Sequence, residues 1–209
     1  MRKRFGICCI ILGVCCLLSS LGLIAYNYWE ERNAQSSSEL LLQDVRRSIP
    51  DNTPDESTLE ESDREGSAEI YVDGPKEMLT APVDGYASIG ILSIPVLDLE
   101  LPVLTEWSYA KLKIAPCLYF GSCYEENFVI AAHNYQSHFG RLSELQPKDL
   151  ILFTDISGKV HCYEVVLLET LPADATEEMI TSGFDLSLYT CTPGGASRVT
   201  VRCCSVSDE

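Results

Sequence analysis

Hydrophobic residues are distributed along this chain in two different ways. Residues 5–29 form an apolar run without an ionised side chain, and roughly 25 such positions are enough for one helix to cross a bilayer. From about residue 78 the apolar residues occur instead in short runs separated by Gly, Pro and Asp, which is typical of β-strands. The pattern predicts an N-terminal anchor at residues 1–29, a polar stem at residues 30–77 and a folded domain at residues 78–209.

The anchor has the features of an uncleaved transmembrane helix. Basic residues at 2–4 precede it, and Tyr26, Tyr28 and Trp29 suit the opposite membrane interface. A cleaved signal peptide is the alternative, but the run is long for one and no Ala-x-Ala-like site follows it. By the positive-inside rule, the remaining chain lies outside the cytoplasmic membrane, so we expect a single-pass membrane protein with an extracytoplasmic domain.

Charge separates the stem from its neighbours and limits the possible partners. Residues 30–77 carry 14 acidic and 5 basic side chains with few large apolar ones, so we expect a flexible acidic stem. A helix over Glu39–Arg47 would be marginal on its own. The net charge of the whole chain is −16, which argues against nucleic acid as a partner because DNA binding depends on neutralising phosphates.

The C-terminal region is predicted to be an all-β barrel or sandwich with two short helical pieces. Its short apolar runs contain β-branched residues and are bounded by turn residues. The expected strands are Ala87–Ile94, Leu99–Leu104, Asn127–Ala132, Asp149–Thr154, Lys159–Thr170, Asp185–Cys191 and Arg198–Cys204, and the expected helices are Trp107–Leu112 and Glu177–Ile180.

The ten cysteines do not define a disulfide framework. Four of them lie in the anchor, where they act as small apolar residues, with lipidation as the alternative. Cys117 and Cys123 either form a disulfide or remain buried free thiols. Cys203 and Cys204 are neighbours in a predicted strand, so they point to opposite faces. No pair of cysteines has the two-residue spacing of a zinc site, so no metal is expected.

Cys191 has a setting that suits chemistry. It ends an apolar run and is followed at once by Thr-Pro-Gly-Gly, so its thiol should emerge at a sheet rim beside a turn. Thiols attack as thiolates and need a nearby cation or base. Arg198 opens the next run and His133 ends another, so three strand ends could converge. Each residue taken singly is more often structural. His138, in a predicted loop, and His161, within a predicted strand, have less favourable contexts for catalysis than His133.

These residues carry a resemblance to the sortases, the membrane-anchored cysteine transpeptidases of mainly Gram-positive bacteria. The segment Leu188–Pro193 with Arg198 resembles the Thr-Leu-x-Thr-Cys signature of that family. The resemblance extends in the family's order over residues 86–204, with further matching segments at 90–95, 101–103, 131–134 and 139–145.

The resemblance implies a closed eight-stranded β-barrel and a defined mechanism. Cys191 would attack the Thr carbonyl of a Leu-Pro-x-Thr-Gly-like sorting signal, and His133 would protonate the departing glycine amine. Arg198 would donate hydrogen bonds to substrate or oxyanion, assisted by backbone donors near Thr190. An amine of a peptidoglycan precursor or a pilin would then resolve the thioester, and no cofactor is required.

Departures from the family pattern bear on the class of sortase. Ser187 replaces the usual Thr, Ala132 stands where Gly is common before the histidine, and the turn from Cys191 to Arg198 is short. The stretch between the strand that begins at Lys159 and Cys191 is too short for the long helical insertion typical of class B, which favours a class A- or D-like enzyme. The alternatives are a pilin-polymerising sortase, an anchored cysteine peptidase and a non-enzymatic surface-binding domain.

Overall fold

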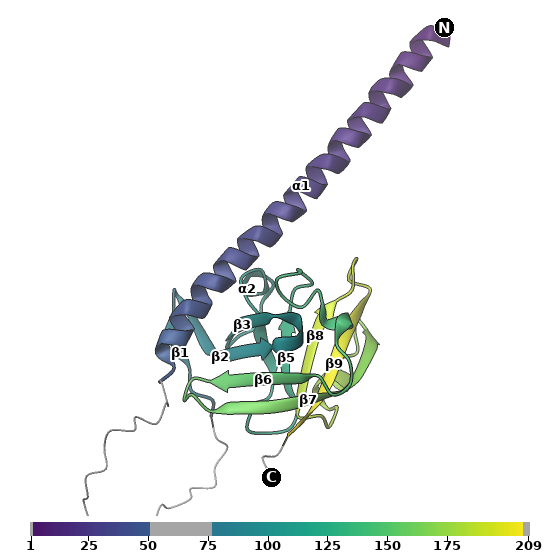
Figure 1. The fold of residues 1–209 in the computed structure, drawn as a ribbon. Helices are drawn as coiled ribbons and strands as arrows, with labels where there is room; N and C mark the ends of the chain where they lie inside the picture. The colour runs from purple at the N-terminus through teal and green to yellow at the C-terminus, as the bar shows by residue number, and fades with distance from the viewer. Residues whose placement is uncertain (1, 51–76, 207–209) are drawn as a thin grey trace, which may run out of the picture.

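A long N-terminal helix and a β-barrel make up the structure (Figure 1). The computed structural model describes residues 2–50 and 77–206. The helices are α1 (Arg2–Ser48), α2 (Tyr109–Leu112) and α3 (Thr176–Ile180), with two 3₁₀ turns, η1 (Pro95–Leu97) and η2 (Leu142–Glu144). The strands are β1 (Ala81–Val83), β2 (Tyr86–Ile94), β3 (Leu99–Leu104), β4 (Cys117–Phe120), β5 (Phe128–Ala132), β6 (Leu150–Asp155), β7 (Val160–Pro172), β8 (Leu186–Cys191) and β9 (Ser197–Ser205).

Eight strands, β2 to β9, close into a barrel. The order is β2-β3-β4-β5-β8-β9-β7-β6, and β6 pairs with β2 to complete the circle, while β1 adds to the side of β2. Closure leaves no free edge among these eight strands. The predicted closed barrel is therefore confirmed, and the sandwich alternative is wrong.

The strand boundaries follow the predicted apolar runs closely. All seven predicted strands are present, and both predicted helical pieces contain a short helix. The sequence analysis missed β1 and β4. These strands have only three and four residues, too few to display an alternating pattern.

The structure differs from the expected flexible stem over residues 30–48, because α1 continues to Ser48. One face of this part of the helix is buried against the barrel through Ala34, Ser38, Leu41 and Val45. Their spacing of four, three and four residues places them in one stripe. Packing of this stripe stabilises a helix that would be marginal alone. Residues 51–76 of the predicted stem lie outside the described residues.

The N-terminal part of α1 projects away from the barrel (Figure 1). It contains one apolar segment that is long enough to cross a membrane and is not buried by the rest of the protein, with a mean hydropathy of 2.0. By length and composition, this segment fits the predicted anchor.

Two apolar clusters hold the domain together. The first fills the barrel interior and includes Phe128, Phe153 and Leu188. The second lies on the outside of the barrel and includes Leu41 and Val45 of α1. The second cluster makes α1 an integral part of the domain surface.

Candidate active site

Strand pairing places Cys191 directly opposite Arg198. The two residues are Cα partners in the antiparallel pair of β8 and β9. Side chains of directly opposed residues lie on the same face of a sheet. Leu186 and Leu188 of β8 point into the barrel core, so alternation along the strand directs Tyr189 and Cys191 to the outside.

The parallel pair of β5 and β8 brings His133 to the same end of the barrel. Ala132 is the Cα partner of Thr190, so His133 follows β5 at the level where Cys191 ends β8. The hydroxyl of Thr190 donates a hydrogen bond of 2.9 Å to the carbonyl of Ala132. The buried Thr190 side chain therefore ties the two strands together, which leaves only its backbone for the predicted oxyanion role.

His133 is half-buried, and its environment favours the neutral imidazole. Burial lowers the pKa of His133, the positive charge of Lys113 lowers it further, and the carboxylate of Glu30 acts in the opposite direction. The centroid of the His133 ring lies 4.9 Å from the centroid of the Tyr135 ring. Among the described residues, none accepts from or donates to the Nε2 atom of His133, which is buried. A reacting group could reach this nitrogen only after a local rearrangement.

Arg198 caps the turn beside Cys191 in this structure. Its Nη1 donates hydrogen bonds of 3.1 Å to the carbonyls of Gly195 and Ser197. The turn itself requires glycine, because Gly194 and Gly195 have φ values of 84° and 74°. These bonds hold the guanidinium at the rim of the barrel, against the turn.

Aromatic side chains lie beside Cys191, a feature that the sequence analysis did not predict. Tyr189 shares the outer face of β8 with Cys191, and its ring packs edge-to-face on Tyr119 with 5.2 Å between the ring centroids. The ring centroid of Trp107 lies 6.0 Å from that of Tyr119 and 5.0 Å from that of Tyr109. These four residues come from three separate segments, so no local sequence signal reveals them. They form an apolar surface next to the thiol.

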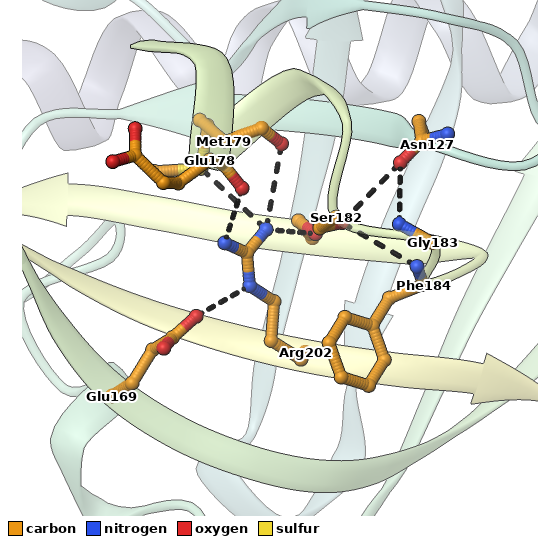
Figure 2. Close-up of polar contacts among 9 residues, drawn as sticks. Asn127, Glu169, Glu178, Met179, Ser182, Gly183, Phe184 and Arg202 are labelled. Carbon is orange, nitrogen blue, oxygen red and sulfur yellow. Dashed lines mark hydrogen bonds and ion pairs between the residues drawn. The ribbon is translucent and has the colours of Figure 1, made fainter. Parts of the chain in front are cut away.

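Arg202 lies four residues beyond Arg198 on β9, and its side chain is held by contacts within the protein (Figure 2). It is 2% exposed, and its guanidinium donates to Glu169 Oε1 at 2.7 Å and to Ser187 Oγ at 2.8 Å. It also donates to the backbone carbonyl of Glu178 at 2.9 Å. Arg202 therefore fixes α3 against the barrel, and its bonding capacity is used within the protein.

The other two histidines differ from His133 in their surroundings. His138 was predicted to lie in a loop; it is fully buried behind Tyr135, whose ring contacts both His133 and His138, and burial lowers the pKa of His138 to about 4. His161 lies in β7 as predicted, where its Nε2 is 3.1 Å from Asp155 Oδ2.

Cys123, Asp155 and His161 form a second cluster of reactive groups. One ligand atom from each lies within 4.8 Å of the others. Burial alone would raise the pKa of Asp155, but hydrogen bonds from Ser157, Tyr124 and His161 outweigh it and bring the pKa to about 2. Asp155 ends β6, whereas Cys123 precedes β5, so this cluster lies at the opposite end of the barrel from Cys191. It was not foreseen from the sequence.

No disulfide joins the described cysteines of the barrel. The disulfide considered for Cys117 and Cys123 is therefore absent, and both side chains are buried, as in the alternative prediction. Burial raises the pKa of Cys117 to about 12, which makes this thiol a poor nucleophile. Cys203 is buried and Cys204 exposed, as expected for neighbours in a strand.

Comparison with known proteins identifies the family. Residues 92–206 match the sortase domain model, which is more than half of the chain. The chain therefore belongs to the sortase family, whose members are cysteine transpeptidases. A comparison with curated proteins finds no match.

Several solved sortase structures share the fold. Sortase A from Corynebacterium diphtheriae is 24% identical with a TM-score of 0.53, and the match covers 59% of this chain and 63% of that one. A sortase C of Streptococcus pneumoniae is 27% identical with a TM-score of 0.52, covering 58% and 67%. A sortase D5 transpeptidase of Clostridium perfringens is 18% identical with a TM-score of 0.51, covering 57% and 79%. Structures named sortase A, C and D match similarly, so these likenesses do not separate the classes.

Proposed function

We propose that this protein cleaves a Leu-Pro-x-Thr-Gly-like sorting signal through a thioester on Cys191 and transfers the acyl group to an amine. The observation that carries the proposal is the register of β5, β8 and β9. It brings His133, from the end of β5, to the end of the barrel where the β8–β9 turn carries Cys191 and Arg198. A thiol, an imidazole and a guanidinium are the groups that covalent acyl transfer needs.

Each group has a distinct role in the reaction. The neutral His133 takes the thiol proton of Cys191, the resulting thiolate attacks the threonine carbonyl, and His133 gives that proton to the departing glycine amine as the C–N bond breaks. Arg198 leaves its carbonyl partners in the turn and donates to the oxyanion or to substrate carbonyls. In the second half-reaction, an acceptor amine attacks the thioester, loses a proton to His133 and releases the thiolate.

The surroundings of Cys191 support a peptide substrate. The aromatic surface made by Tyr189, Tyr119, Trp107 and Tyr109 lies next to the thiol. Rings of this kind bind leucine and proline side chains by apolar contact. Tyr109 is 69% exposed, so part of this surface is open to a ligand.

The contacts of α1 support a membrane-associated reaction. Lys113 Nζ lies 2.6 Å from Glu30 Oε1, and the backbone nitrogen of Gln136 donates to Glu31 Oε1 at 2.8 Å. Gln136 belongs to the loop that follows His133, so α1 leaves the barrel at the end that carries the candidate site. If the preceding segment spans the membrane with its basic tip inside, this site faces the outer membrane surface, where an anchored sorting signal would lie.

The proposal also covers the acceptor amine and the class of sortase. We favour a class A- or D-like enzyme that anchors surface proteins to a peptidoglycan precursor. A pilin-polymerising sortase uses the same thioester with a pilin amine, and an anchored cysteine peptidase would pass the thioester to water. The alternative thiol, Cys123, is less suited to attack a peptide because it is only 8% exposed.

Incubation of the full-length protein with a sorting-signal peptide and a candidate amine tests this function. We expect an amide product whose yield rises with amine concentration, and acid alone would indicate a peptidase. Arg198→Lys keeps the charge but loses the planar donor geometry, so turnover should fall on the order of 10²-fold. Cys204→Ala, which changes an exposed thiol on the same strand, is the control and should retain activity.

A further inference from the structure

The second cluster, at the far end of the barrel, contains three different metal-ligating groups. Cys123 lies before β5, Asp155 ends β6 and His161 lies in β7. The Cys123 thiol, one Asp155 oxygen and one His161 nitrogen lie within 4.8 Å of one another. The side chains of Asp155 and His161 are 2% and 10% exposed, so the groups are shielded from bulk water.

Hydrogen bonds hold the Asp155 carboxylate in a fixed orientation. Its Oδ1 accepts from the backbone nitrogens of Ser157 and Lys159 at 2.9 and 3.1 Å. Its Oδ2 accepts from the hydroxyl of Tyr124 at 2.7 Å and lies 3.1 Å from His161 Nε2. One oxygen is thus bound to a turn, while the other points toward the imidazole. Outer partners of this type orient metal-binding carboxylates.

A hollow of about 510 Å³ adjoins the cluster and is lined by Cys123 and His161. It has room for a water molecule as a fourth ligand. Its wall also contains the acidic residues Glu125, Glu126 and Asp185, against one lysine, Lys159. The local charge therefore favours a cation.

We propose that Cys123, Asp155 and His161 bind one zinc ion at the end of the barrel opposite Cys191. Thiolate, imidazole and carboxylate are the three ligand types that zinc takes in proteins, usually in tetrahedral geometry. Tetrahedral bonds of about 2.0–2.3 Å separate ligand atoms by roughly 3.3–3.8 Å, so ligand atoms at the 4.8 Å limit would have to move about 1 Å or more closer together. Binding displaces the thiol proton to solvent, and the ion's two positive charges balance the thiolate and the carboxylate.

Such a site would join the segment before β5 to the β6–β7 hairpin. It has no short sequence signature, because Asp155 lies 32 positions after Cys123. This explains why cysteine spacing alone predicted no zinc site. The role is structural or regulatory, since Cys191 lies at the other end of β8.

Cobalt(II) provides a spectroscopic probe of this site. Full-length protein in detergent is stripped with a chelator and titrated with cobalt(II). We expect one equivalent of cobalt(II) to produce the intense visible bands of a tetrahedral centre and a thiolate-to-cobalt charge-transfer band. Zinc should displace the cobalt and remove both sets of bands. Cys123→Ser should abolish the charge-transfer band, and Tyr124→Phe should weaken binding about 10–100-fold. The matched control, Cys162→Ser, lines the same hollow but is outside the trio, and it should bind normally.

X-ray absorption at the zinc edge of the unmutated protein keeps the test independent of any folding defect in a variant. One sulfur together with nitrogen and oxygen ligands supports the proposal. A zinc shell without sulfur, a shell with two or more sulfurs, no zinc binding, or a charge-transfer band that survives in Cys123→Ser would overturn it. These outcomes leave the proposed reaction at Cys191 unaffected, because no step of it uses the metal.

Discussion

Replacing Arg202 with methionine should separate the two arginines of β9 by their roles. Methionine preserves much of the apolar volume but has no donor. The change removes the charge-assisted bond to Glu169 and the bond to the Glu178 carbonyl (Figure 2). It also removes the bond to Ser187 Oγ. Arg198 and its contacts at the rim remain in place.

The expected cost follows from what each former partner can do without Arg202. Ser187 is fully buried, and a buried polar group left without a partner costs about 1–3 kcal/mol. The Glu178 carbonyl adds a cost of the same kind. The Glu169 side chain is 31% exposed, so water partly solvates its charge and its share must be discounted. We expect a total loss of about 3–5 kcal/mol, which is in the range for breaking one side of a buried ion pair.

Urea unfolding of the full-length protein in detergent, followed by circular dichroism, measures this loss. The matched control is Arg46→Met, which removes the exposed ion pair with Glu100 and should cost less than about 1 kcal/mol. Arg202→Met should also retain its turnover per folded molecule. An unfolding free energy equal to that of the control would refute the structural role that we assign to Arg202.

Two further predictions concern acid stability and the docking of α1. The pKa of buried His138 is lowered to about 4, so the unfolded state binds its proton more tightly. The contribution of neutral His138 to stability should be complete above pH 6.5, and the free energy of unfolding should fall by about 3 kcal/mol as the pH drops toward 4. His138→Phe should remove this part of the pH dependence in urea titrations, and an unchanged profile would contradict it. Leu41→Ala should lower the free energy of unfolding by about 2–3 kcal/mol and speed hydrogen exchange in the second half of α1. The control Leu40→Ala, at an exposed position, should change neither. Equal effects of the two substitutions would contradict the packing of α1 against the barrel.

Local pattern was sufficient to predict the strands that carry the candidate site. Alternating apolar residues and the Pro-Gly-Gly turn marked the ends of β8 and β9, and the apolar run before His133 marked β5. Strand ends collect at the rims of a closed barrel, so Cys191, His133 and Arg198 could be expected to meet once the barrel was inferred. Their convergence is a property of register, and register follows from the apolar pattern.

Features that depend on contacts between distant segments could not be predicted in this way. The docking of α1 needs the outer surface of β1 to β3 as a partner, and the sequence of residues 30–48 alone indicates only a marginal helix. The cluster of Cys123, Asp155 and His161 depends on how three segments meet at the far rim. The burial of Arg202 depends on α3 folding back over β9. A single arginine in a predicted strand gives no sign that its side chain is buried.

Trapping the thioester decides whether Cys191 is the nucleophile. Full-length protein is mixed with a sorting-signal peptide without an acceptor amine, quenched in acid and digested, and the acylated peptide is located by mass spectrometry. We expect an adduct on the peptide that contains Cys191, its loss when amine is added, and no adduct in Cys191→Ala. An acyl group on Cys123, or full turnover by Cys191→Ala, would exclude Cys191 as the nucleophile.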